Sequence, residues 1–183
     1  MRLDFLIRRR GTDPAAETAL HALRDLMHVA VFDVVRGTLW RFDVEDHDDV
    51  AAVQAVLQRA ASRAGRYVNT NRDACAWLDA TRIPAADNAR PGCAVSVWVT
   101  SGDGKDEVAR EYFATRTGER VTRARRGTFY CLWTAERDPE TAREQILDVA
   151  VTRTRQHGLL SNPHHESVEV LAVAPTTKPV EAT

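Results

Sequence analysis

The chain has 183 residues, of which 44% are hydrophobic and 28% are charged, and its formal net charge is -1. This composition is typical of a folded protein and argues against intrinsic disorder. Because the charges nearly cancel, no global field would attract nucleic acid or an acidic membrane, and we expect neither as a partner. Without an apolar run long enough for a signal peptide or a membrane span, we expect a cytoplasmic protein.

The three cysteines, Cys75, Cys93 and Cys131, are widely spaced among small and apolar residues. An odd number of cysteines in a chain expected in the cytoplasm favours reduced thiols over disulfides. We therefore predict three reduced, buried cysteines.

An internal repeat organises the chain, because Arg36-Gly37-Thr38 returns 90 residues later as Arg126-Gly127-Thr128. The same shift pairs residues that do the same physical work, such as aspartates at expected helix starts. Two halves with a common backbone plan are therefore predicted.

The first half alternates extended and helical patterns. Residues of alternating polarity predict strands, and apolar residues at helical spacing behind an aspartate predict helices. Gly37 interrupts an extended stretch and is expected to supply a turn. In chain order, the expected elements are a strand at 3–7, a helix capped by Asp13, a hairpin or sharply bent strand at 31–44, a helix capped by Asp48, and a strand near 75–78.

The second half repeats this order, with Gly127 at the expected bend. Asp138 precedes Pro139, and proline is favoured in the first turn of a helix because its missing N–H is not needed there. In chain order, the expected elements are a strand at 93–99, a helix capped by Asp103, a hairpin or sharply bent strand at 121–134, a helix capped by Asp138, and a strand near 168–173.

This order predicts an α+β protein made of two tandem ferredoxin-like βαββαβ units, related by a pseudo-two-fold. Each unit would have an antiparallel sheet with its helices on one face. The expected boundaries are 1–79 for the first unit, 80–92 for a linker, 93–174 for the second unit and 175–183 for a flexible tail.

The second unit has an apolar pattern on both faces of its expected sheet. Trp98, Phe129 and Trp133 would lie on the face away from the helices, where polar residues are usual. We expect this face to pack on the other unit, on another protomer or on a partner. The alternative is that these aromatic residues are scattered along the sheet edges.

The combination of Asp13-Pro14, Val35-Arg36-Gly37-Thr38-Leu39-Trp40 and Leu159-Leu160-Ser161-Asn162-Pro163 resembles PurS, the small subunit of phosphoribosylformylglycinamidine synthase. Each half resembles one copy. The resemblance implies a non-catalytic, self-pairing subunit without a cofactor. Such a subunit joins a glutaminase to an ATP-dependent synthetase, so that ammonia reaches formylglycinamide ribonucleotide.

The resemblance also implies homo-oligomers and a set of contact residues. The expected binding and partner residues are Arg36, Gly37, Arg126, Gly127, Trp98, Phe129, Trp133, Asn162 and Pro163. Two features depart from the usual family pattern. Two units are joined in one chain, and the first half has Tyr67-Val68-Asn69-Thr70 where the second has Leu160-Ser161-Asn162-Pro163.

An alternative hypothesis is a stand-alone enzyme or ligand-binding protein of a specialised pathway. It would use the cleft between the units, with Arg126 or a group of titratable side chains in acid–base or anion-binding roles. The candidate catalytic residues under this hypothesis are His157, His164, His165 and Glu166. Adjacent histidines point in different directions, so we expect no metal site.

Two charged clusters allow both a binding and a structural interpretation. The arginines at 8, 9, 10, 123, 125 and 126 could hold the phosphate of a small molecule between the units, or could be solvated strand residues or partner contacts. The acidic run at 45–49 invites a cation site, but carboxylates are already favoured at a helix start and the glycine of a calcium loop is absent. We favour the structural interpretation of the acidic run.

Overall fold

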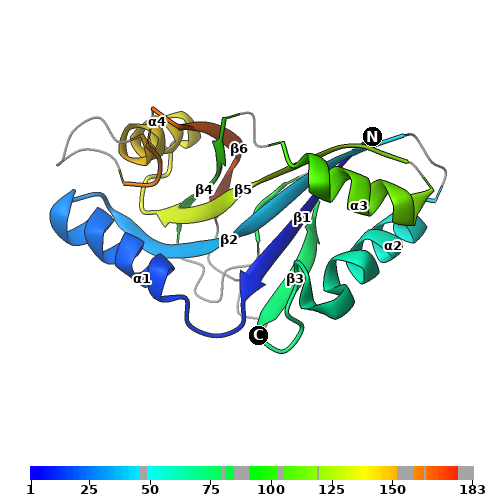
Figure 1. The fold of residues 1–183 in the computed structure, drawn as a ribbon. Coiled ribbons are helices and arrows are strands. Elements are labelled where there is room, and N and C mark those ends of the chain that lie inside the picture. Colours follow the sequence, from blue (N-terminus) through cyan, green and yellow to red (C-terminus); the bar gives the residue numbers. More distant parts are fainter. Residues whose placement is uncertain are drawn as a thin grey trace, which may run out of the picture.

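The computed structural model describes residues 1–45, 49–79, 81–84, 91–102, 105–118, 120–151, 159–162 and 164–176. Within these residues, an α+β fold combines six strands with four α-helices (Figure 1). The strands are β1 (Arg2–Arg9), β2 (Val31–Val44), β3 (Asp73–Leu78), β4 (Gly92–Ser101), β5 (Val121–Thr134) and β6 (Glu166–Thr176). The helices are α1 (Pro14–His21), α2 (Val50–Ser62), α3 (Glu107–Thr117) and α4 (Pro139–Ala150), with a π-helical turn at Ala22–Leu26 and a 3-10 turn at Arg63–Gly65.

All six strands belong to one antiparallel sheet in the order β3-β1-β2-β5-β4-β6. This order is symmetric if β1, β2 and β3 correspond to β4, β5 and β6. At the centre of the sheet, Thr38 of β2 pairs directly with Thr128 of β5. These two threonines are also the partners in the sequence repeat, so the pairing places equivalent positions of the two halves symmetrically about one point.

Of the two forms expected at 31–44 and 121–134, the hairpin is wrong, because Gly37 and Gly127 each lie inside one continuous strand of 14 residues with these bounds. Neither glycine has a positive φ angle. Their role is to permit close strand packing: a Cβ on Gly37 would lie 2.6 Å from the carbonyl oxygen of Ile7, and a Cβ on Gly127 would meet the carbonyl oxygen of Val99. Each half therefore contributes three strands to a shared sheet, and the separate four-stranded units are not seen.

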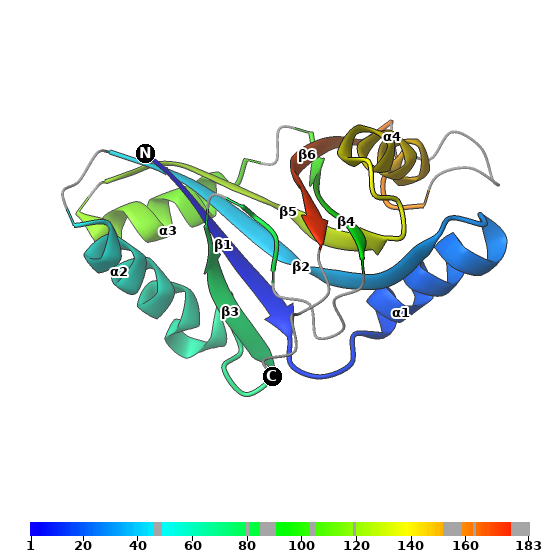
Figure 2. The same ribbon diagram turned by 180° about the vertical axis from the view of Figure 1, so that it is seen from behind.

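The helices pair across the halves, so that α1 lies beside α4 and α3 beside α2 (Figures 1 and 2). Leu23, which follows α1, belongs to the same apolar core as Val95 of β4. Phe113 of α3 packs its ring 4.9 Å from that of Phe42 in β2 and 5.8 Å from that of Trp40. The first helix of each half thus covers the core of the other half, since a continuous β2 or β5 carries the chain from one core to the other.

Both helix pairs cover the same face of the sheet. Val34 faces one core, whereas Trp40 and Phe42 face the other, and all three have the same parity along β2. Successive side chains of a strand point to opposite faces, so residues of equal parity share a face.

The opposite face of the sheet is also apolar, as the apolar pattern on both faces of the second half predicted. Trp98, Phe129 and Trp133 form a buried cluster there with Leu6 and Leu39 of the first half. Of the three coverings expected for this face, contact with the other half is the one that the structure shows. The exposed fractions of the three aromatic residues are 2%, 0% and 1% within the single chain, and their expected role in partner binding stays a prediction.

A buried ion-pair network ties the two halves together on this face. Arg41 of β2 donates hydrogen bonds to Asp4 at 2.8 and 3.1 Å and to Glu169 of β6 at 2.8 and 3.0 Å. Its guanidinium lies 4.5 Å from the ring of Trp98. Burial opposes the charged form of Arg41, but the two carboxylates outweigh it and raise its pKa. Because β5 and β4 lie between β2 and β6, the sheet must curl for this bridge to form.

The helix starts are confirmed at Asp13 and Asp138, whose side chains accept hydrogen bonds from the first turns of α1 and α4. The other caps are Asp49 and Asp106 rather than the expected Asp48 and Asp103. Several acidic residues compete for each position, and Asp48 and Asp103 lie outside the described residues.

The cysteines are free thiols. Cys93 and Cys131 are buried as expected, whereas Cys75 is partly exposed. In the part of the chain that the structure describes, no helix is long and apolar enough to cross a membrane.

Candidate functional site

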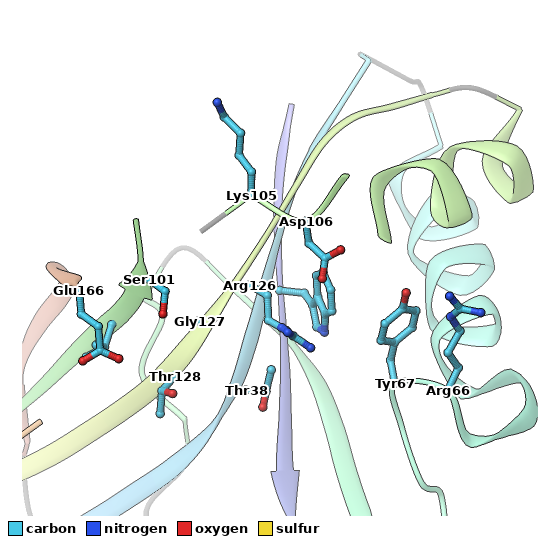
Figure 3. Close-up of a pocket in the computed structure, with 12 residues that line it drawn as sticks. Thr38, Arg66, Tyr67, Ser101, Lys105, Asp106, Arg126, Gly127, Thr128 and Glu166 are labelled. Atoms are coloured by element: carbon cyan, nitrogen blue, oxygen red, sulfur yellow. The ribbon is translucent and has the colours of Figure 1, made fainter. Parts of the chain in front are cut away.

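A cavity of about 400 Å³, here called the central pocket, opens on the helix-covered face beside the N-terminus of α3 (Figure 3). It reaches the Thr38–Thr128 pair at the centre of the sheet, so both halves contribute to its walls. Its lining residues are Thr38, Trp40, Arg66, Tyr67, Val99, Ser101, Lys105, Asp106, Arg126, Gly127, Thr128 and Glu166.

Two arginines of the central pocket stack on aromatic rings. The guanidinium of Arg126 lies 5.4 Å from the centre of the buried Trp40 ring. Arg66 lies 5.5 Å from the ring of Tyr67 and 4.6 Å from that of Tyr112, and hydrogen bonding to Tyr67 raises its pKa. Stacking fixes the plane of a guanidinium and leaves its N–H edge available for an anion.

Both carboxylates of the central pocket accept hydrogen bonds from the backbone. Asp106 accepts one from the N–H of Ala109 at 2.9 Å and so caps α3. Glu166 accepts one from the N–H of Asn162 at 2.8 Å and so closes the turn before β6. The two acids thus stabilise the walls of the cavity. Glu166, a candidate catalytic residue under the alternative hypothesis, therefore has a structural role in the turn before β6.

The turn closed by Glu166 has a counterpart in the first half. Asn69 donates its backbone N–H to Asp73 at 2.9 Å, as Asn162 does to Glu166. The side chain of Asn69 accepts from the N–H of Asn71, and that of Asn162 accepts from the N–H of His164, both at 3.1 Å. Asn69 and Asn162 therefore make the same hydrogen bonds in the two halves, although the sequences around them have diverged, and Asn162 has a structural role.

The acid of the first turn is shifted in its pKa. Burial raises the pKa of the Asp73 carboxyl, but hydrogen bonds from Asn69 and Arg72 outweigh burial and leave the pKa below its ordinary value. The ionised form of Asp73 is therefore the one that stabilises the turn.

A smaller cavity of about 230 Å³ lies on the first-half side of the Thr38–Thr128 pair. It shares Thr38 and Tyr67 with the central pocket. Arg36 lines it in the place that Arg126 has in the central pocket, and stacks 5.9 Å from the ring of Tyr130. It forms an ion pair, at 3.7 Å, with Asp13, whereas Arg126 has no ion-pair partner among the residues that the structure describes.

The structure brings together some of the residues expected from the sequence and separates others. Arg126, Gly127 and Glu166 line the central pocket, and Arg36 and Gly37 line its smaller counterpart. The exposed His164 and His165 lie on the turn before β6 and do not line the central pocket. His157 and Pro163 lie outside the described residues.

Sequence reasoning missed nine of the twelve residues that line the central pocket. The charged and hydroxyl-bearing ones among them are Thr38, Arg66, Tyr67, Ser101, Lys105, Asp106 and Thr128. Tyr67 could have been noticed, because an aromatic residue stands where the other half has Leu160, just before the turn that both halves share. Arg66 and Lys105 lie in polar segments whose spacing gives no such signal.

No family model matches the chain, and no curated protein matches it. Among the described residues, no group of three or more His, Cys, Asp and Glu side chains is arranged to hold a metal ion.

Proposed function

We propose that the chain is a PurS-like accessory subunit. It would bind a glutaminase and an ATP-dependent synthetase in formylglycinamidine ribonucleotide synthesis or in a related amidotransferase pathway. The partners follow from the resemblance to PurS, and the way in which the two halves are joined supplies the physical basis.

The observation that carries the proposal is the mutual dependence of the halves. One sheet runs through both halves across the β2–β5 pairing, and each half buries its first helix against the other. When the gene of a self-pairing subunit is duplicated and fused, the two copies can form one such shared sheet within a single chain, because fusion makes the effective concentration of the second copy high. The fused copies can then diverge without losing their pairing.

The outer strands support two different contacts. Among the described residues, β3 pairs only with β1 and β6 pairs only with β4, so each has an unpaired edge. An unpaired edge can accept a strand from another chain. Because β3 and β6 differ in sequence and lie at opposite ends of the sheet order, the two edges can serve different partners.

The test is reconstitution with glutaminase and synthetase subunits from the same genome. In the presence of glutamine and magnesium ADP, analytical ultracentrifugation should detect a complex that contains all three chains. Glutamine-dependent amidation should then require this chain, whereas amidation with free ammonia should not. Amidation from glutamine at full rate without the chain, together with no complex, would refute the proposal.

A further inference from the structure

The central pocket and its counterpart differ in charge balance, although they occupy related places. In the smaller cavity, the arginine of the repeated Arg-Gly-Thr motif, Arg36, is held by Asp13. In the central pocket, the same motif provides Arg126. Among the described residues, Arg126 makes no ion pair and no hydrogen bond, and its interaction is the stack on Trp40. The guanidinium of Arg126 thus lines the central pocket without a carboxylate partner from the described part of the chain.

The geometry of Arg126 suits an anionic group. Its side chain extends from β5 across the floor of the pocket towards Thr38 and Tyr67 (Figure 3). Thr128 lies beside Thr38 in the strand pairing, so two hydroxyl-bearing side chains line the same pocket as the guanidinium. A guanidinium that can give two parallel N–H bonds, together with hydroxyl donors, is a typical phosphate-binding set.

The nearby acids do not remove this preference for an anion. Asp106 and Glu166 each direct an oxygen to a backbone N–H of their own turn. Arg66 adds a second guanidinium beside Tyr67, stacked on the tyrosine rings. Arg126 and Arg66 thus bring two guanidinium groups to the pocket, whereas both of its carboxylates cap backbone turns.

We propose that the central pocket binds a phosphorylated small molecule, whose phosphate contacts Arg126 and the hydroxyl groups of Thr38 and Thr128. A cavity of about 400 Å³ lies within the range of pockets for small ligands. Tyr67, partly exposed in the same wall, offers an aromatic surface to the remainder of the ligand. This site does not depend on the accessory-subunit proposal and can be tested on the isolated chain.

The experiment measures binding of phenyl phosphate and inorganic phosphate to the purified chain by calorimetry, at constant ionic strength. Phenol serves as the uncharged control and sulfate as the control for a non-specific anion effect. Arg126→Ala is compared with the matched variant Arg36→Ala, which removes the equivalent arginine from the smaller cavity. Circular dichroism checks that both variants keep the fold, which is expected because Arg126 is exposed and Arg36 is only partly buried.

We expect saturable binding of phenyl phosphate that is tighter than that of inorganic phosphate, sulfate or phenol. Arg126→Ala should weaken it by about tenfold or more, since a charge-assisted contact is lost, and Arg36→Ala should leave it within about twofold. No saturable binding by the wild-type chain would overturn the proposal. Equal losses in the two variants would also overturn it, because binding would then follow surface charge. A phosphoserine peptide that binds more tightly than phenyl phosphate would replace the small molecule with a protein ligand and would equally overturn it.

Discussion

A single methyl group added at Gly37 or Gly127 should destabilise the sheet at two equivalent places. At Gly37, the new Cβ would lie 2.6 Å from the carbonyl oxygen of Ile7 and 2.8 Å from Cδ1 of Leu6. At Gly127, it would lie 2.7 Å from Cγ2 of Thr100 and would also meet the carbonyl oxygen of Val99. These carbonyl groups belong to paired strands, so the strands have to move apart.

The expected cost of each substitution to alanine is about 2 to 3 kcal/mol in the free energy of unfolding, as for other overpacked sites. For a chain of this size, such a loss lowers Tm by roughly 4 to 12 °C. Urea denaturation gives the free energy, and thermal denaturation followed by circular dichroism gives Tm.

Gly118→Ala is the matched control. Gly118 ends α3 with φ 68°, and a Cβ added there would have no atom within 4 Å, so its substitution carries a conformational cost of about 1 kcal/mol without a steric one. If Gly37→Ala and Gly127→Ala were no more destabilising than this control, the close packing at the two glycines would not exist in solution.

Three further predictions concern buried groups. Under native conditions a thiol reagent should modify Cys75 alone, and it should reach Cys93 and Cys131 only after denaturation, because these two are buried; fast modification of all three would contradict the packing. Asp4→Asn should lower the free energy of unfolding by about 3 to 5 kcal/mol, since Asp4 balances a buried arginine, and a urea midpoint equal to that of the wild type would exclude the ion-pair network. Asp73→Asn should cost about 1 kcal/mol at neutral pH. The folded-state pKa of Asp73 is lowered, so this stabilisation is present above the unfolded-state pKa of about 3.9 and is lost as pH falls through the folded-state value. The two stability curves should therefore converge in acid, and a constant difference down to the lowest pH would contradict the assignment.

The sequence predicts elements that are marked by local chemistry. Alternating residues at 3–7 and 93–99 indicate strands, and aspartate followed by proline marks the starts of α1 and α4, because these signals depend only on neighbouring residues. The apolar second face near Trp98 was also visible as a pattern, although what covers it was not.

The path of the chain around the two repeated glycines could not be predicted. A glycine that permits a turn and a glycine that permits close strand packing look the same in a sequence. Taking Gly37 and Gly127 as turns gave four strands per half and kept each helix on its own unit. Continuous strands instead carry each first helix to the other half.

The candidate site was predicted only in part, because local patterns mark some of its residues and only the tertiary fold brings in the others. Arg126 and Glu166 stood out through a repeated motif and a cluster of titratable residues, whereas Arg66 reaches the central pocket only through the tertiary fold. The aromatic stack beneath Arg126 depends on the pairing between β2 and β5, which lie far apart in sequence, and no local pattern reports such a pairing.

A nuclear Overhauser measurement on the isotope-labelled chain tests the two-half architecture most directly. We expect cross-peaks between the ring protons of Phe113 and those of Phe42, together with cross-strand contacts between Thr38 and Thr128. Contacts of Phe113 with second-half residues alone, and none between the two threonines, would show that each half folds on its own helices and would contradict the shared sheet.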